Sequence, residues 1–478
     1  MNKSPTLLQS IIPIVLLMGL IACNVLWLND DTLGGANQLS LLIAAAVAAS
    51  FALFNKISWK MLMNGIIKAI TTSFPAIMIL LMVGALSGAW MLSGIIPTMI
   101  YWGLEILRPA YFLPACVIIC AAVSLATGSS WSTVATIGVA LIGIGSVMGI
   151  NPAYSAGAII SGAYFGDKIS PLSDTTNLAA AVAKTDLFVH IKYMLQTTTP
   201  SIILAIIGFI LITIFTKNIE TSLETVRQFQ LTIKEMYNTN LLLLLVVVLV
   251  VYLIVKKVPP VPVLFIGAIL GIATALIFQF DYIKELCSGA VSLQSGYEVC
   301  VRALFGTTAP ETGNAEINEL LTTRGMAGML NTIWLIITAM IFGGIMEAGR
   351  FLERITQAIL SKAKTAQTLV TSVAGTCALF NVTTGDQYVA IVVPGNMYDP
   401  AFQKAGLEGR LLSRTLEDSG TVTSVLVPWN TCGATQASVL GVATTAYAPF
   451  AFFCWISPLM TLFFVWRKIG IKKLTINH

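Results

Sequence analysis

The sequence predicts an all-α protein that crosses a membrane many times and consists of two halves of opposite orientation. Three observations support this class: the hydropathy of the chain, the positions of its basic residues and an internal repeat. Of the 478 residues, 56% are hydrophobic and only 10% are charged, whereas a soluble domain carries roughly 25% charged residues. The mean hydropathy of +0.85 excludes an ordinary soluble domain.

Apolar segments that reach or approach the roughly 20 residues needed to cross a bilayer recur along the chain. The first of them follows a single lysine and is longer than the apolar core of a cleaved signal peptide, so we expect it to be a retained helix. The predicted segments are Leu7–Leu28, Leu39–Phe54, Phe74–Trp90, Ile202–Phe215, Leu241–Val255, Val261–Phe278, Thr332–Met346 and Ala446–Phe464. Two shorter pieces, Ile95–Ile106 and Leu352–Leu360, leave the number of complete crossings open.

The basic residues lie at the ends of these segments and indicate their orientation. Lys3 precedes the first segment, and Asp30 and Asp31 follow it, so the positive-inside rule places the N-terminus in the cytoplasm. The segment that opens the second half ends at Lys256 and Lys257, and it therefore runs from outside to inside. Further cytoplasmic positions are expected at Lys56, Lys60, Arg350, Arg354, Lys362, Lys364, Arg467, Lys468, Lys472 and Lys473. Both termini are thus predicted to be cytoplasmic.

The two halves carry a weak internal repeat. Thr127–Ser129 resembles Thr384–Asp386, and Pro171 corresponds to Pro428, with an offset of 257 in both cases (128 to 385 and 171 to 428). Further correspondences at this offset are Ser173 with Asn430 and Asp174 with Thr431. A repeat of reversed orientation is typical of secondary transporters. The predicted division is a first inverted-topology repeat at 1–217, an external linker at 218–237 and a second inverted-topology repeat at 238–478.

Polar clusters interrupt the apolar sequence at four places. They are Ala126–Thr133, Phe165–Val182, Asn381–Tyr388 with Leu416–Ser424, and Pro428–Gly433. Segments of this composition cannot face lipid at membrane depth, so they are expected to line a cavity. Their hydroxyls, amide oxygens and carboxylates are hard oxygen ligands that suit Na⁺, and the carboxylates also suit protons. Glycine in or beside each cluster allows a helix to unwind and turn its carbonyls toward an ion.

These clusters supply the candidate ion-site residues. Asp386 and Asp174 are the predicted central carboxylates, followed by Asp167, Glu417 and Asp418. Burial and a neighbouring like charge both raise the pKa of a carboxylate, which would bring its protonation into the physiological range. Neutral oxygen ligands are expected from Ser129, Thr127, Asn177, Thr383, Asn430 and Thr431. Na⁺ and H⁺ would be the transported ions, and no cofactor is expected.

Simpler roles stay open for several of these carboxylates. Asp167 and Lys168 could be solvated at a cytoplasmic helix end. Asp174 could be a helix N-cap, and a cap role can coincide with an ion-site role. Asp418 could pair with Arg414, which lies one helical turn earlier.

Composition argues against other kinds of site. The net charge of +5 is modest and the basic residues lack aromatic interleaving, so no nucleic-acid partner is expected. Two histidines and eight scattered cysteines without a CxxC pair offer almost no ligands for a zinc site. Cys116 and Cys120 lie four positions apart, which indicates packing on one helix face. Cys287 and Cys300 share a polar loop and could pair if that loop is external.

The polar clusters also carry a family resemblance. The segment GDKISPLSDTTNLA (Gly166–Ala179) resembles the hallmark segment of the NhaC-type Na⁺/H⁺ antiporters, in the wider ion-transporter group. The runs TTGDQYVAIVVPGNMY, LSRTLEDSGTVTSVLVPWNTCGA and YAPFAF resemble the same family, and the match extends from about Met78 to Phe464. The resemblance implies sodium–proton exchange in a bacterial plasma (inner) membrane, with broken helices and re-entrant hairpins. It also implies a homodimer with a moving transport domain, in contact with membrane lipid.

Three functions follow as hypotheses. The first is a Na⁺/H⁺ antiporter, which is a transporter and not an enzyme. The second is a Na⁺- or H⁺-coupled carrier or exchanger of a small organic acid (malate- or lactate-like) or amino acid, as in some relatives of the resembled family. Unwound helix ends bind carboxylates, and Lys168 is the only clear cationic candidate in the polar clusters. The third is an intramembrane enzyme that uses Asp167 and Asp386, but the overlay places Ser424 rather than an aspartate opposite Asp167.

Overall fold

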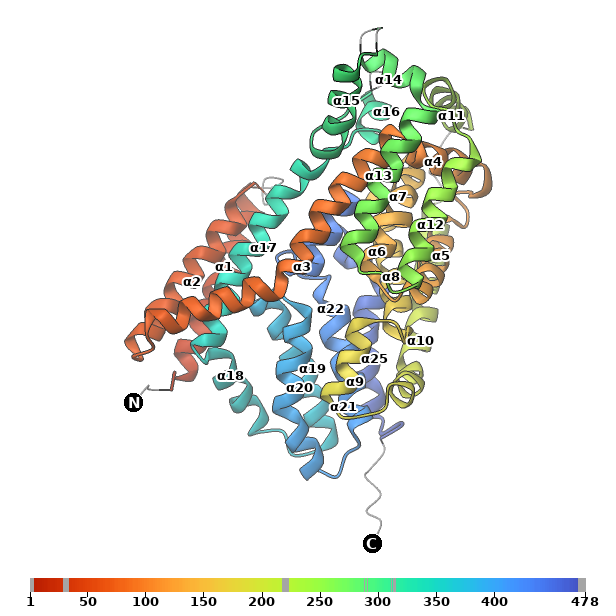
Figure 1. Ribbon diagram of the computed structural model, residues 1–478. Helices are drawn as coiled ribbons and strands as arrows, with labels where there is room; N and C mark the ends of the chain where they lie inside the picture. The colour runs from red at the N-terminus through yellow and green to blue at the C-terminus, as the bar shows by residue number, and fades with distance from the viewer. Residues whose placement is uncertain are drawn as a thin grey trace.

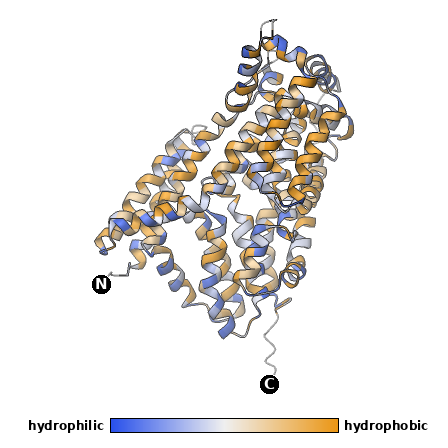
Figure 2. Cartoon of the chain, in the orientation of Figure 1, coloured by the Kyte–Doolittle hydropathy of each residue, from blue (hydrophilic) through white to orange (hydrophobic). Residues whose placement is uncertain are grey.

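The computed structural model describes residues 4–28, 34–216, 223–287, 289, 291–310, 312 and 315–471. Over these residues the chain is almost entirely helical, and its extended pairing is limited to a bridge between Thr308 and Thr323. Seven of the described helices are long and apolar enough to cross a membrane, or nine if each of two bent pairs is one crossing. Apolar residues run along these helices, and polar residues gather mainly near their ends (Figure 2). The predicted all-α class with many membrane crossings is confirmed.

Part of the predicted topology lies outside the described residues. Lys3, Asp30, Asp31, Lys472 and Lys473 belong to the undescribed stretches, as do residues 218–222 of the predicted linker. The cytoplasmic location of both termini, the inverted relation of the halves and their boundaries stay predictions.

The helices follow one another along the chain as Figure 1 shows. Before the predicted linker they are α1 (Leu7–Leu28), α2 (Ala36–Phe54), α3 (Trp59–Leu92), α4 (Ile95–Ile106), α5 (Phe112–Thr127), α6 (Ser130–Thr133), η2 (Val134–Gly138), α7 (Val139–Val147), α8 (Pro152–Ile169), α9 (Asp174–Val182) and α10 (Leu187–Phe215). The following ones are α11 (Leu223–Met236), η3 (Leu241–Leu243), α12 (Leu244–Val255), α13 (Pro260–Phe278), α14 (Phe280–Leu286), α15 (Leu293–Phe305), α16 (Ala315–Leu320), η4 (Met326–Met329), α17 (Leu330–Ala348), α18 (Phe351–Leu360), α19 (Ala366–Thr384), α20 (Gln387–Lys404), α21 (Gly409–Leu416), η5 (Glu417–Thr421), α22 (Val422–Ser424), α23 (Thr431–Leu440), α24 (Thr444–Tyr447), η6 (Ala448–Phe450) and α25 (Phe452–Trp466).

Several expected segments are parts of longer or bent elements. Phe74–Trp90 lies within α3, which runs for 34 residues. Ala446–Phe464 is divided between the α24–η6 helix and α25, which are bent by 53° relative to each other. The helix Ser130–Val147 is also long and apolar enough to cross, although its hydroxyl-rich start concealed it in the sequence. Helices α4 and α18, with 12 and 10 residues, are too short to cross a bilayer alone.

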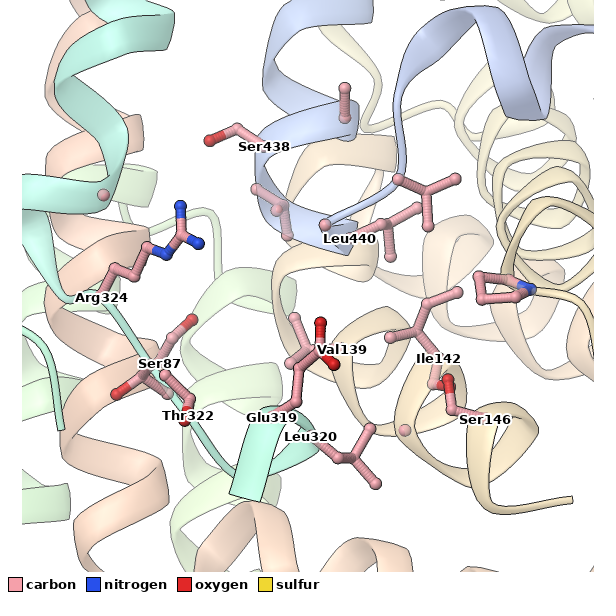
Figure 3. Close-up of a pocket in the computed structure, with 18 of the residues that line it drawn as sticks. Ser87, Val139, Ile142, Ser146, Glu319, Leu320, Thr322, Arg324, Ser438 and Leu440 are labelled. Carbon is pink, nitrogen blue, oxygen red and sulfur yellow. The ribbon is translucent and has the colours of Figure 1, made fainter. Parts of the chain in front are cut away.

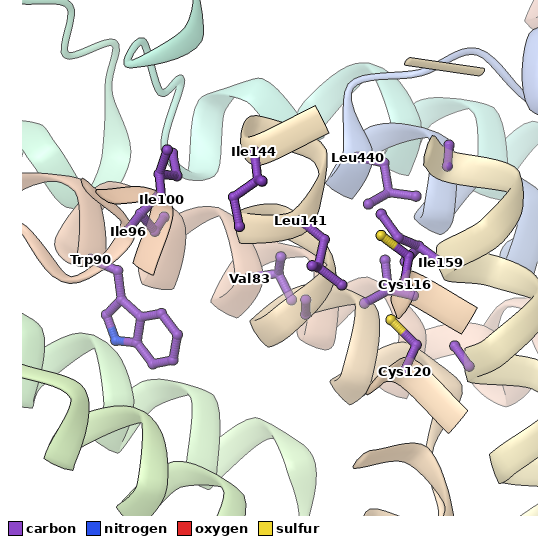
Figure 4. Packing of buried hydrophobic residues seen from close by; sticks show 14 of the residues in the cluster. Val83, Trp90, Ile96, Ile100, Cys116, Cys120, Leu141, Ile144, Ile159 and Leu440 are labelled. Carbon is purple, nitrogen blue, oxygen red and sulfur yellow. The ribbon is translucent and has the colours of Figure 1, made fainter. Parts of the chain in front are cut away.

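Helix α3 connects two of the apolar cores. Its first part, including Leu62 and Leu80, packs with α1, α2 and α17, whereas the part from Val83 to Leu92 belongs to a core shared with α4, α5, α7 and α8. Figure 4 shows this second core at close range. A third core joins α9 and α10 to α19, α20 and α21. Residues from both predicted halves therefore pack together in each core.

The cysteines are all free thiols. Cys116 and Cys120 are fully buried on α5 in the second core (Figure 4), which confirms their packing role. Cys287 and Cys300 are not joined in a disulfide.

Glycines let α8 approach α5 very closely. A methyl group at Gly162 would lie 2.2 Å from the carbonyl oxygen of Val117, and one at Gly166 would lie 2.4 Å from that of Ala121. The spacing of these glycines is the small-xxx-small pattern by which membrane helices bring their backbones together. This contact fixes the C-terminal end of α8, which carries Asp167 and Lys168.

We expect Gly162→Ala to lower the apparent melting temperature of the purified protein in detergent. The added methyl group must push α8 away from α5, and overpacking of this kind costs about 1–3 kcal/mol. Gly19→Ala in α1 is the matched control, because nothing lies within 4 Å of the position its methyl group would take. Equal melting temperatures for the two variants would contradict the close contact.

Candidate functional site

Two helix breaks have the same local design. α5 ends at Gly128 and α19 ends at Gly385, and both glycines are left-handed, with φ of 69° and 66°. The next residue in each case is extended and caps the following helix. Ser129 accepts a hydrogen bond from the Ser132 amide (3.2 Å), and Asp386 accepts from the amides of Tyr388 and Val389 (2.8 and 3.1 Å). Only glycine enters this left-handed conformation without strain, which explains its presence at both breaks.

A second pair of caps follows at the same offset of 257. Ser173 caps α9 and accepts from the Thr176 amide (3.4 Å), whereas Asn430 caps α23 and accepts from the Cys432 amide (3.0 Å). Asp174 is the first residue of α9, so the alternative that it is the N-cap is wrong. Residues that correspond at the offset of 257 therefore also share their local backbone conformation.

Asp167 links the end of α8 to the first helix break. Its side chain is buried, and one carboxylate oxygen accepts from the backbone amide and the hydroxyl of Ser130 (3.1 and 2.7 Å). A solvated position for Asp167 and Lys168 is therefore wrong, since Lys168 is also fully buried. Sequence reasoning named Thr127 and Ser129 here but missed Ser130, which lies in the same hydroxyl-rich run. Thr127 itself lies near the hydroxyl of Thr133 (3.4 Å).

Asp386 is buried at the second break and also contacts α3. The hydroxyl of Ser73 donates to its second carboxylate oxygen (3.2 Å). Ser73 was missed, although it ends a polar run before Pro75 within a long apolar helix. Thr383, one turn before Asp386, donates its hydroxyl to the backbone of Leu379 (2.7 Å).

Glu417 and Asp418 begin the π-helical turn η5, and both are fully buried. Glu417 accepts from the hydroxyl of Thr175 on α9 (3.0 Å). Asp418 forms a salt bridge with Lys168, so the alternative that it pairs with Arg414 is wrong. The guanidinium of Arg414 instead lies over the ring of Tyr193 at 4.6 Å.

Hydroxyl groups surround the Lys168–Asp418 pair. Ser457 accepts from the Lys168 ammonium (2.6 Å) and donates to Asp418 (3.0 Å). Thr197 (2.9 Å) and Thr461 also donate to Asp418. The pair is therefore a closed polar cluster between α8, α10, α25 and η5.

Tyr388 lies directly beside Asp386. It was missed by sequence reasoning, although it belongs to the polar run that contains Asp386. Its backbone amide donates to the Asp386 carboxylate (2.8 Å), and its side chain is exposed. Asp174 is also exposed, whereas Asp167, Asp386 and Glu417 are buried.

Three of the neutral candidates, Asn430, Thr431 and Asn177, form hydrogen bonds with backbone carbonyls. The Asn430 amide donates to the carbonyl of Asn381 (3.1 Å), and the Thr431 backbone amide donates to the carbonyl of Gly385 (2.8 Å). Asn177 is exposed and donates to the carbonyls of Pro171 and Ser173 (3.0 and 2.7 Å). In the described part of the chain, no three His, Cys, Asp or Glu side chains form a metal-binding group. A cation there would need hydroxyl and carbonyl oxygens to complete its shell.

A large cavity of about 1400 Å³ lies against α23 (Figure 3). We call it the main cavity. Its walls come from both predicted halves, including α3, α4, α7, α16 and α23. Pro428 and Ala434 line it, so it ends beside the cap of α23.

A model of the Na⁺/H⁺ antiporter family matches residues 162–469, which include three of the four polar clusters. The chain belongs to this family of transporters. The Na⁺/H⁺ antiporter NhaC of Alkalihalophilus pseudofirmus is 35% identical over 442 residues, which are 91% of each chain. The NhaC of Bacillus subtilis is 35% identical over 430 residues, or 89% of this chain and 91% of that protein. A malate-2H⁺/Na⁺-lactate antiporter of the same organism is 33% identical over 448 residues, or 94% and 92%.

The family predicted from the polar segments is therefore confirmed, as are the many membrane crossings of a transporter with broken helices. The hypothesis of an intramembrane enzyme needed Asp167 and Asp386 within hydrogen-bond reach of each other. Asp167 is instead hydrogen bonded to Ser130, and Asp386 to Ser73 and its own helix.

Removing one partner of the Lys168–Asp418 pair should destabilise the protein more than removing both charges. Asp418→Asn leaves a buried ammonium group without a counter-charge, which costs about 3–5 kcal/mol. We expect a large fall in the apparent melting temperature in detergent. The double variant Lys168→Gln/Asp418→Asn should recover much of that fall, because no uncompensated charge remains.

The more exposed pair of Lys68 and Glu347 is the control for this cycle. Their side chains are 72% and 35% exposed, and exposed pairs contribute only about 0–1 kcal/mol. Lys68→Gln, Glu347→Gln and the double variant should change the melting temperature little. If the double variant at Lys168 and Asp418 lowers the melting temperature by the sum of the two single decreases, the two charges do not depend on each other.

Proposed function

We propose that this protein is a secondary active transporter that exchanges Na⁺ for protons at a shared carboxylate site. One observation carries the proposal. Asp167, Asp386 and Glu417 are buried, and none of them forms a salt bridge with a basic side chain in the described part of the chain. A buried carboxylate without a counter-charge is unfavourable at membrane depth, so each of them favours a metal cation or a proton as its partner.

The proposed cation ligands combine these carboxylates with nearby oxygens. Asp386, Asp174 and Asp167 would provide the charge, with Glu417 beside them. Ser73 joins the ligands expected from sequence because its hydroxyl donates to Asp386. The remaining candidates are Ser129, Thr127, Asn177, Thr383, Asn430 and Thr431. Asp418 is a weaker candidate, because Lys168 already neutralises it.

Competition between the two cations is sufficient for coupling. When the carboxylates are deprotonated they attract Na⁺, and when they are protonated they release it. The empty site is negatively charged and therefore crosses the membrane poorly. Exchange then requires that the loaded site, with either Na⁺ or protons, reorients between the two sides.

The cellular setting is part of the same proposal. The relatives named above come from bacteria, which supports a location in the bacterial plasma membrane. The basic residues favour cytoplasmic termini. A homodimer and a moving transport domain follow from the family resemblance.

A carrier of a small organic solute is the second candidate. The similar malate-2H⁺/Na⁺-lactate antiporter supports it. Lys168 does not provide the cationic group that this candidate needs, because Asp418 and Ser457 already occupy its ammonium.

We expect Asp386→Asn to reduce Na⁺-dependent proton exchange by at least about ten-fold, as loss of a ligand or of its support commonly does. The measurement is dye-reported pH change in proteoliposomes of the purified protein. Asp281→Asn on α14 is the matched control, since Asp281 is exposed and lies outside the polar clusters. If Asp386→Asn keeps full exchange with unchanged pH dependence, Asp386 is not a ligand.

The apparent KM for Na⁺ should rise as the pH falls. Protons and Na⁺ compete for one site, so the KM should increase by at most about ten-fold per pH unit for each competing proton. The maximal rate at saturating Na⁺ should change much less. A KM that is constant while the maximal rate follows the pH would mean that protons act at a separate site.

A further inference from the structure

A groove of about 440 Å³ lies between α1, α18, the start of α19 and the end of α25. α18 packs beside both α1 and α19 (Figure 1). Ile355, Ala358 and Ile359 lie on one face of α18 and line the groove, and Leu7 of α1 also lines it. Lys362, just after the end of α18, is the charged side chain among the described residues that line it. We call this the interfacial groove.

Aromatic and basic residues place the interfacial groove at the membrane surface. Trp466 lines it, and the indole N–H of Trp466 donates to the hydroxyl of Thr371 (3.2 Å). Tryptophan at the end of an apolar helix is typical of the boundary between lipid tails and headgroups. Lys364, Arg467 and Lys468 are exposed and lie within two positions of residues that line the groove. The positive-inside rule assigns them to the cytoplasm, so the groove opens at the predicted cytoplasmic surface.

The basic residues at the groove have no acidic partner in the described part of the chain. Lys362 and its three basic neighbours form no salt bridge there. The acidic residue of α18, Glu353, is paired with Arg350 instead (2.7 Å). The rim of the groove therefore favours a negatively charged ligand, whereas its apolar wall favours a hydrocarbon chain.

Other occupants fit the groove less well. The nearest parts of the sequence outside the described residues contain Lys3, Lys472 and Lys473, which carry the same sign of charge as Lys362. A second copy of the chain would bring the same basic residues to the contact, and like charges across an interface are unfavourable. An anionic phospholipid combines a negatively charged phosphate with apolar chains. Anionic lipids of the cytoplasmic leaflet are attracted to basic segments at this level of the membrane.

We propose that the interfacial groove binds a phospholipid with an anionic headgroup, whose phosphate pairs with Lys362 and one of whose acyl chains packs against α1 and α18. Such a lipid also joins two of the apolar cores. Phe351 and Leu352 of α18 belong to the first core, together with α1, whereas Leu369 and Val370 of α19 belong to the third. The groove shares no residue with the proposed cation site. Binding at it does not require that cation exchange occurs.

The test is native mass spectrometry of the purified full chain in detergent, which counts the bound lipids. Palmitoyl-oleoyl phosphatidylglycerol is titrated, and phosphatidylcholine with the same chains serves as the lipid without net charge. Inorganic phosphate is added at constant ionic strength as a competitor without chains. The variants are Lys362→Gln, which removes the charge, and Ala358→Phe, which fills the groove. Lys60→Gln is the matched control, because Lys60 is exposed, is also expected on the cytoplasmic side and does not line the groove.

We expect phosphatidylglycerol to bind about five-fold more tightly than phosphatidylcholine, since one lysine near an anionic lipid contributes about this factor. Lys362→Gln should remove the preference, because the two lipids then differ only in a charge that no side chain of the groove contacts. Ala358→Phe should weaken the binding of both lipids. Lys60→Gln should change neither affinity.

Equal binding of the two lipids by the unaltered protein, or a preference that Lys362→Gln leaves unchanged, would overturn the proposal. Lipid binding that Ala358→Phe leaves unchanged, or displacement of the lipid by inorganic phosphate, would assign the charge to a free anion. A dimer that Ala358→Phe converts to a monomer without loss of lipid would assign the groove to a second copy of the chain. None of these measurements involves cation exchange, so failure of this site and failure of the proposed function are seen separately.

Discussion

The cost of holding a charge without a counter-charge at membrane depth governs how this chain arranges Lys168 and the carboxylates around it. Lys168 and Asp418 are fully buried and neutralise each other, and hydroxyl groups of α10 and α25 satisfy the remaining oxygens of Asp418. Since this pair uses the ammonium of Lys168, the adjacent Asp167 and Glu417 have no salt-bridge partner left among the described residues. In the proposed exchange, these two uncompensated carboxylates would be available to a mobile cation or proton.

Close backbone approach makes this arrangement possible. Gly162 and Gly166 bring α8 against α5, so the carboxylate of Asp167 reaches the first residues after the break in the neighbouring helix. In the second half, the carbonyl of Gly385 receives the backbone amide of Thr431, which joins the break after α19 to the start of α23. A side chain at Gly162 or Gly166 would push α8 away from α5. The packing of these glycines thus positions residues of the proposed cation site.

The sequence predicts those parts of the site that depend on local backbone conformation. The left-handed glycines and the caps at Ser173 and Asn430 recur at one offset, because turn and cap chemistry is encoded within a few residues. Contacts between distant segments could not be predicted in this way. The pairing of Lys168 with Asp418 spans 250 positions. The alternative partner, Arg414, lies over the ring of Tyr193 on α10 instead, while Asp418 is paired with Lys168.

The two helix breaks differ in how they place an anion at the first amides of the following helix. The first amides of a helix carry a partial positive charge and favour an anion. At the second break Asp386 provides that anion on its own helix, as its cap. At the first break the cap is the neutral Ser129, and Asp167 reaches the Ser130 amide from α8. Both carboxylates are thereby stabilised as anions by fixed donors, yet neither receives a full positive charge. An anion held in this state binds a small cation without needing one permanently, which is the balance that reversible exchange requires.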